Sequence, residues 1–246
     1  MPRARRNRDT PRIAGTGSRT SVETWSAEHL AALAAAAAAA ALLVGIARRG
    51  GDRRAGRALA VVIAAAYVVE QLSYALAGDW SAQLNLPLHL TDAVTFASVA
   101  ALWRPDISWL VERVYFWPLS ASLQAVLTPD LGHGFPDVRF FTYFATHAGA
   151  IAAALLLVVG ARRLPRPGAV RRVYAATAAF ALLAAAGTVI TGGNYMYLRH
   201  KPAHDSLLDV MGPWPVYIAA GAALALAIFV ALDLIARPAR GPTRRR

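Results

Sequence analysis

The chain of 246 residues is 57% apolar, contains no cysteine and carries a formal net charge of +12. The missing cysteines exclude disulfides, thiolate metal sites and a cysteine nucleophile. Nearly all of the positive charge is arginine, placed between and outside long apolar runs rather than among aromatic residues. Arginines in such positions are typical of contacts with anionic lipid headgroups. We therefore expect membrane lipids as partners and no nucleic acid, while the oligomeric state is left open.

The N-terminal part combines a polar segment with a long apolar run. Residues 1–23 are rich in arginine and cannot bury a core, so we expect a disordered basic tail there. Residues 30–47 form the first apolar run, whose alanines would satisfy the cleavage rule of a signal peptide. The run is longer than a signal-peptide core and arginines follow it directly, so we expect it to span the membrane.

Six further apolar runs follow along the chain, each about long enough to cross a bilayer as a helix. They cover residues 58–77, 84–103, 107–127, 138–160, 173–190 and 214–232. The predicted fold is an all-α, polytopic bundle of seven transmembrane helices, or six if the first run is cleaved or peripheral. Residues 24–236 are expected to form a single transmembrane helical domain, followed by a basic cytoplasmic tail at 237–246.

The distribution of arginines predicts the orientation. With seven spans, the arginine-rich segments at 48–57, 104, 162–172 and 237–246 share one side, and the opposite loops hold only Arg139, Arg199 and Lys201. The positive-inside rule then places the C-terminus in the cytoplasm and the N-terminus outside, in the cell membrane. The arginines of the N-terminal tail oppose this orientation, but most are distant from the first span, and Glu23 and Glu28 lie closer to it.

Polar and ionisable residues within the spans are the candidates for function, because a bilayer tolerates them at a high energetic cost. His89 and Asp92 share a helix face at i, i+3 spacing, and Arg139, Tyr143 and His147 repeat every four residues. In the predicted orientation the polar residues gather in the outer half of the bundle. We expect an outward-facing polar cavity lined by Glu70, Gln71, Gln124, Arg139, Tyr143, Asn194 and Tyr195. Interhelical hydrogen bonds without any chemistry would also explain such residues.

Metal binding and cofactors are not expected. His200 and His204 are four residues apart, but they lie in a loop with Pro202 between them. A zinc hydrolase could use His89, Asp92 and His147, but two histidines and one carboxylate form a sparse ligand set.

Five motifs resemble a known family of membrane proteins. They are the segments 87–90, 127–132, 139–147, 193–198 and 206–215, which read PLHL, LTPDLG, RFFTYFATH, GNYMYL and SLLDVMGPWP. Over residues 58–235 the chain resembles the YwaF-like family of bacterial integral membrane proteins. That family is distantly similar to vertebrate transmembrane phospholipid acyltransferases, which use a cysteine nucleophile and a histidine within the membrane.

The resemblance implies a catalytic arrangement, with one departure. The usual family pattern is His-Leu-Cys, whereas this chain has His89, Leu90 and Thr91. A hydroxyl needs an activating base, for which His147 is the candidate, oriented by Asp92 or Glu70. His89 or Asn194 would then stabilise the oxyanion. Threonine–histidine pairs of this kind resemble membrane hydrolases of fatty acid esters of hydroxy fatty acids.

Several functions therefore remain open at this point. The first is lipid acyl transfer or lipid ester hydrolysis that uses Thr91 and His147, with His89 and Asp92 as further catalytic residues. The second is transport of a small molecule or ion through Glu70, His89, Asp92 and His147. Alternatively, Thr91 is a small helix-packing residue and the protein has a structural role.

Overall fold

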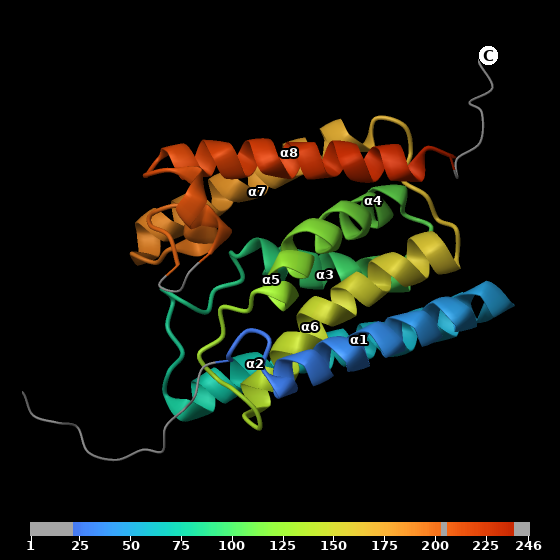
Figure 1. Cartoon of the computed structure of the whole chain (residues 1–246), viewed down its shortest axis with the longest axis horizontal. Coiled ribbons are helices and arrows are strands. Elements are labelled where there is room, and N and C mark those ends of the chain that lie inside the picture. Colours follow the sequence, from blue (N-terminus) through green and yellow to red (C-terminus); the bar gives the residue numbers. More distant parts are fainter. Residues whose placement is uncertain (1–21, 203–205, 239–246) are drawn as a thin grey trace, which may run out of the picture.

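The computed structural model describes residues 22–202 and 206–238, and this part of the chain consists of helices and loops (Figure 1). The α-helices are α1 (Ala27–Ile46), α2 (Asp52–Ala77), α3 (Leu90–Trp103), α4 (Ser108–Phe116), α5 (Leu123–Leu127), α6 (Val138–Leu155), α7 (Ala169–Thr191) and α8 (Val216–Ala236). Three π-helical turns extend them, at η1 (Ala47–Gly51), η2 (Pro118–Ser122) and η3 (Leu156–Gly160). The predicted all-α class is confirmed for the described residues. The tails expected at 1–23 and 237–246 lie almost wholly outside them.

Four helical segments are long and apolar enough to cross a membrane: Ala27–Ala77, Val138–Gly160, Ala169–Thr191 and Val216–Ala236. The first of these contains two helices, because Gly50 adopts a φ of 86° and breaks the helix between α1 and α2. A positive φ suits glycine, which has no Cβ to clash with the backbone. After this break α2 runs back beside α1 (Figure 1). The total of seven spans and the orientation of the termini stay predictions.

The third predicted span is shorter than the apolar pattern indicated. We expected a helix over residues 84–103, but α3 begins only at Leu90. The backbone N–H of His89 donates to the Asp92 carboxylate at 2.9 Å, which caps the helix at this point. Upstream, the Tyr195 hydroxyl donates to the Ala82 carbonyl at 2.6 Å and accepts from the Leu86 N–H at 3.1 Å. These tertiary bonds hold the preceding segment as a loop.

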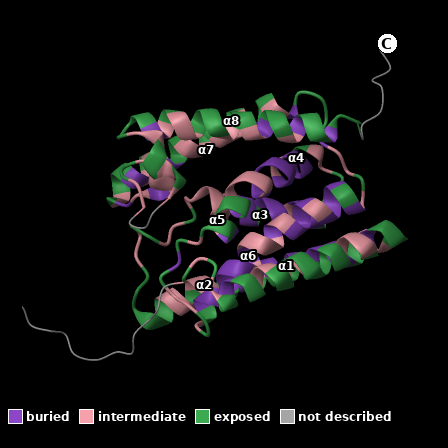
Figure 2. Ribbon diagram, in the orientation of Figure 1, coloured by how far each residue is buried: buried purple, intermediate pink, exposed green. Residues whose placement is uncertain are grey.

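The core of the bundle surrounds α6. In the most apolar stretch of the α6–η3 segment 56% of the residues are buried, whereas the share is 11–17% in the other three candidate spans. Helices α1, α2, α3 and α4 all pack on α6, while α7 and α8 pack on each other and cover the α3–α4 side. Figure 2 shows the buried residues concentrated on the inner helices and exposed residues on α1, α7 and α8. Apolar side chains such as Leu76, Val189 and Ile190 point outwards, as expected for a surface in contact with lipid.

The first apolar run is fastened to the rest of the bundle by a buried histidine. The His29 ring bonds the Val126 carbonyl through Nε2 at 2.8 Å and accepts the Trp25 N–H through Nδ1 at 3.0 Å. Ser26 caps the start of α1 by accepting the His29 N–H at 3.3 Å. Helix α1 therefore belongs to the packed structure of the bundle.

Candidate functional site

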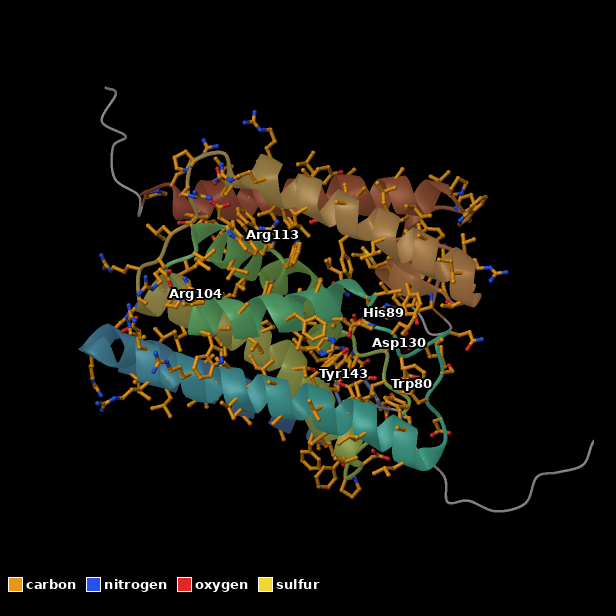
Figure 3. All side chains as sticks on the ribbon, turned by 180° about the vertical axis from the view of Figure 1, so that it is seen from behind. Trp80, His89, Arg104, Arg113, Asp130 and Tyr143 are labelled. Carbon is orange, nitrogen blue, oxygen red and sulfur yellow. The ribbon has the colours of Figure 1, made fainter. Side chains whose placement is uncertain are left out.

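The candidate site lies at the end of the bundle where α3 begins. Figure 3 labels His89, Asp130, Tyr143 and Trp80 towards this end, whereas Arg104 lies towards the other. Side chains from α2, α3, α6 and the α7–α8 connection meet here. Part of the polar set expected from the sequence thus lies at one end of the bundle, while its function and the membrane side it faces stay predictions.

His89 is held by the segment that connects α7 to α8. Its Nδ1 accepts the backbone N–H of Met196 at 3.3 Å, and its ring lies 5.2 Å from the Tyr195 ring and 6.0 Å from the Tyr197 ring. When Nδ1 accepts, the neutral imidazole carries its proton on Nε2. His89 is therefore oriented as a hydrogen-bond donor through Nε2.

The backbone segment that bonds His89 is strained. Met196 and Tyr197 adopt φ values of 52° and 56°, in the left-handed region that side-chain-bearing residues rarely occupy. The Tyr197 hydroxyl donates to Asp130 at 2.8 Å, and the Tyr217 hydroxyl donates to the Tyr197 carbonyl. Burial and the Asp130 carboxylate raise the pKa of Tyr197, so this phenol stays a protonated donor. Strained residues held by several contacts are frequent at functional sites.

On α6, His147 is fixed by its own helix. Its Nδ1 lies 2.9 Å from the Tyr143 carbonyl and 3.2 Å from the Thr146 hydroxyl, and its ring stacks on Tyr143 at 4.1 Å. The Tyr143 hydroxyl in turn donates to the Ala125 carbonyl at 2.8 Å. Donation from Nδ1 to the carbonyl leaves Nε2 as an acceptor, and it has no hydrogen-bond partner among the described residues. This is the tautomer that a general base needs.

One carboxyl group, that of Asp92, bonds the His89 backbone, and a second, that of Glu70, lies within electrostatic range of Asp92. Asp92 interacts with the Tyr67 phenol and with the carboxyl of Glu70, which also lies within electrostatic range of Arg139. Paired carboxyls among apolar helices are costly and mark functional sites. The structure therefore links Asp92 to His89 and to Glu70, while a shared functional role of these three residues stays a prediction.

Arg139 organises the neighbouring loops instead of facing His147. Its guanidinium, almost fully buried, donates to the Ser73 hydroxyl and carbonyl at 3.2 and 3.0 Å and to Asp79 at 3.2 Å. It also bonds His133 and lies 4.2 Å from the centre of the Tyr74 ring. The polar stripe expected on α6 is thus divided between this network and the Tyr143–His147 stack.

Four further residues expected to line the cavity have local partners. Gln71 accepts from the Trp80 indole at 3.1 Å, and Gln124 donates to Thr128 at 2.6 Å, in both cases at exposed positions. Asn194 bonds the backbone of Arg199 and His200, so its amide stabilises its own loop. Tyr195 is fully buried, with its hydroxyl engaged by the loop before α3. The Asn194 side chain thus closes its own turn, and its place in a cavity stays a prediction.

Thr91 lies in the first turn of α3, next to the cap. Its carbonyl accepts from the Thr95 hydroxyl at 2.9 Å, and its own hydroxyl has no hydrogen-bond partner within residues 22–202 and 206–238. No hydrogen bond joins Thr91 to His147 in that part of the chain. A Thr91–His147 pair therefore stays a prediction.

The polar cavity expected from the sequence stays a prediction. The described residues contain no group of three or more histidines, aspartates or glutamates placed to hold a metal ion, and His204 lies outside them. Two hollows of about 590 and 670 Å³ are lined by residues of other regions.

Two contacts were missed at the level of sequence. Tyr67, beside Asp92, lies three residues before Glu70 and therefore on the same helix face. Asp130 belongs to the LTPDLG motif, and its partner Tyr197 belongs to GNYMYL. The spacing along α2 could have identified Tyr67, whereas the Asp130–Tyr197 bond joins two loops 67 residues apart and left no periodic signal.

Comparison with known proteins places the chain in a family. No curated protein and no solved structure matches it significantly. A sequence profile described as the TMEM164 family matches residues 24–233, which include every helix from α1 to α7 and most of α8. The chain is therefore a multi-pass membrane protein that belongs to the TMEM164 family.

Proposed function

We propose that the protein transfers or hydrolyses acyl groups of membrane lipid esters at the site between α3 and α6. The observation that carries this proposal is the state of His147, whose Nδ1 is bonded to the Tyr143 carbonyl while Nε2 is left to accept a proton. A base held in this tautomer inside a membrane bundle suits a lipid substrate, which would enter from the bilayer. The resemblance to the YwaF-like proteins and to phospholipid acyltransferases supports the same chemistry.

The nucleophile in this proposal is the Thr91 hydroxyl. Its oxygen attacks the ester carbonyl while His147 Nε2 takes the hydroxyl proton, which forms a tetrahedral intermediate. Collapse breaks the bond to the lipid alkoxide, which leaves with the proton from His147, and an acyl-threonine remains. Water or the hydroxyl of a second lipid then attacks the acyl group with His147 again as base, and the threonine hydroxyl is restored.

Charge on the oxyanion would be stabilised by the beginning of α3. The first N–H groups of a helix have no partner within the helix and carry partial positive charge. His89 Nε2, oriented as a donor by the Met196 contact, lies one helical turn or less from Thr91 along the chain. Donors fixed in advance at the position of the developing charge are a large contribution to catalysis.

Thr91 and His147 must approach each other when substrate binds. Catalytic hydrogen bonds are often long or absent before the substrate is present. Asp92 accepts the His89 N–H, and Glu70 lies within electrostatic range of Asp92. In this proposal Asp92 positions His89 and Glu70 sets the local charge.

Mass spectrometry of the lipids of the host cell tests the proposal. Cells with the native protein, the deletion, Thr91→Ala, His147→Gln and the control Thr128→Ala are compared, since Thr128 is an exposed threonine outside the proposed site. We expect the deletion, Thr91→Ala and His147→Gln to shift the same acyl species, and Thr128→Ala to match the native protein. If the deletion alone shifts lipids, Thr91 is not the nucleophile. If nothing shifts, acyl transfer is refuted and transport through Glu70, His89, Asp92 and His147 becomes the function to test.

A further inference from the structure

A second feature lies at the opposite end of α7 from the candidate site. A groove of about 590 Å³ runs between the first turns of α7 and the last turns of α8. Helix α7 has 23 residues, which at 1.5 Å per residue corresponds to about 34 Å. The groove is therefore separated from His89 by roughly the thickness of a bilayer core.

The walls of the groove are apolar. Val170 and Ala175 line it from α7, and Leu226 and Val230 line it from α8. The Tyr174 hydroxyl donates across to the Ala222 carbonyl of α8 at 3.3 Å and so bridges the two helices. A groove of this composition on the outer surface of a membrane bundle accommodates hydrocarbon.

The mouth of the groove has a net positive charge, because two arginines and one aspartate, Asp233, line it. Arg171 lines it and has no hydrogen-bond or ion-pair partner among the described residues. Arg237, on the α8 side, pairs with Asp233 at 3.1 Å, but its side chain is 61% exposed. The groove also includes Gly168, the residue that precedes α7, so the positive end of the α7 dipole faces the same place. The arrangement favours an anion directly next to hydrocarbon.

We propose that this groove binds one anionic phospholipid, with the phosphate at Arg171 and an acyl chain against Val230 and Leu226. Arginine suits a phosphate because its planar guanidinium can donate two parallel hydrogen bonds. A free phosphate ion would contact only the mouth and leave the apolar walls unused. The lipid is a bound partner that is independent of acyl transfer, because the groove contains no nucleophile–base pair.

Native mass spectrometry of the full-length protein tests the proposal. The protein is taken from nanodiscs of phosphatidylcholine with a minor fraction of phosphatidylglycerol, and the lipids that remain bound are counted. One arginine near a membrane surface contributes about 1 kcal/mol to anionic lipid binding, which corresponds to about a fivefold change in affinity. We therefore expect Arg171→Gln to reduce retention of phosphatidylglycerol about fivefold.

Two further variants make the result specific. Arg49→Gln removes the same charge at the exposed α1–α2 connection, outside the groove, and should leave retention unchanged. Val230→Trp fills the groove without changing charge and should abolish retention of the bound lipid. A thermal unfolding curve confirms that each variant is folded. Equal retention by Arg171→Gln and Arg49→Gln, or full retention by folded Val230→Trp, would overturn the proposal.

Discussion

The sharpest stability prediction concerns a buried carboxylate at the arginine-rich end of the bundle. The Glu112 side chain is 1% exposed, and its Oε1 accepts from Arg166 Nε at 2.8 Å and from Arg172 Nη2 at 2.7 Å. Its Oε2 accepts from Arg172 Nε at 3.0 Å. Both arginine side chains are about half exposed. The Glu112 carboxylate therefore carries most of the desolvation cost of the ion pairs. The two arginines stay in contact with water even when Glu112 is removed.

This difference in exposure determines which variant loses more unfolding free energy. Removing one partner of a fully buried ion pair costs about 3–5 kcal/mol. Arg172→Gln leaves Glu112 with Arg166, so we expect a smaller loss of about 2–3 kcal/mol. Glu112→Gln leaves no buried charge and keeps the shape of the side chain, so about 1 kcal/mol is expected. At about 2–4 °C per kcal/mol, Arg172→Gln lowers the Tm by roughly 4–12 °C and Glu112→Gln by roughly 2–4 °C.

The assay is thermal unfolding of the purified protein in detergent, followed by circular dichroism. Arg49→Gln is the control, because Arg49 is exposed and has no hydrogen-bond or ion-pair partner among the described residues. Its Tm should equal that of the native protein. If Glu112→Gln is more destabilising than Arg172→Gln, or if both equal the control, the reasoning from the buried carboxylate is wrong.

Three other changes test contacts elsewhere, each by the same unfolding measurement. His29→Leu removes the buried bond to Val126 and should cost about 1–3 kcal/mol; an unchanged Tm would show that α1 is not fastened to the bundle. Arg139→Lys should be almost as destabilising as Arg139→Met, because an ammonium cannot reproduce the guanidinium fork; full stability of the lysine variant would contradict this. Gly193→Ala should lower the Tm, since a Cβ there would collide with the Gln83 carbonyl oxygen; an unchanged Tm would show that the loop yields.

The helices were predictable because apolar runs determine them almost alone. The run at residues 138–160 corresponds to α6 and η3, and that at 173–190 falls within α7. The beginning of α3 was not predictable in the same way. Residues 84–89 are apolar enough for a helix, but they stay a loop because Tyr195, more than a hundred positions later, bonds Leu86 and Ala82.

The site was predictable as a group of residues but not as a set of contacts. Shared helix faces placed His89 with Asp92 and Tyr143 with His147 correctly. Spacing could not show that the long Arg139 side chain reaches Asp79, or that Asn194 bonds its own loop. Those contacts depend on the conformation of loops, whose sequences have no periodic pattern from which contacts can be predicted.

The most direct measurement is acyl transfer by the purified protein in nanodiscs that contain a phospholipid with an isotopically labelled acyl chain. The account predicts that the label appears in free fatty acid or in a second lipid, and that Thr91→Ala and His147→Gln abolish it. The control variants Thr128→Ala and His200→Gln, both at exposed positions, should remain fully active. Turnover that persists in folded Thr91→Ala or His147→Gln, or no turnover by the native protein with any phospholipid class, would contradict the account.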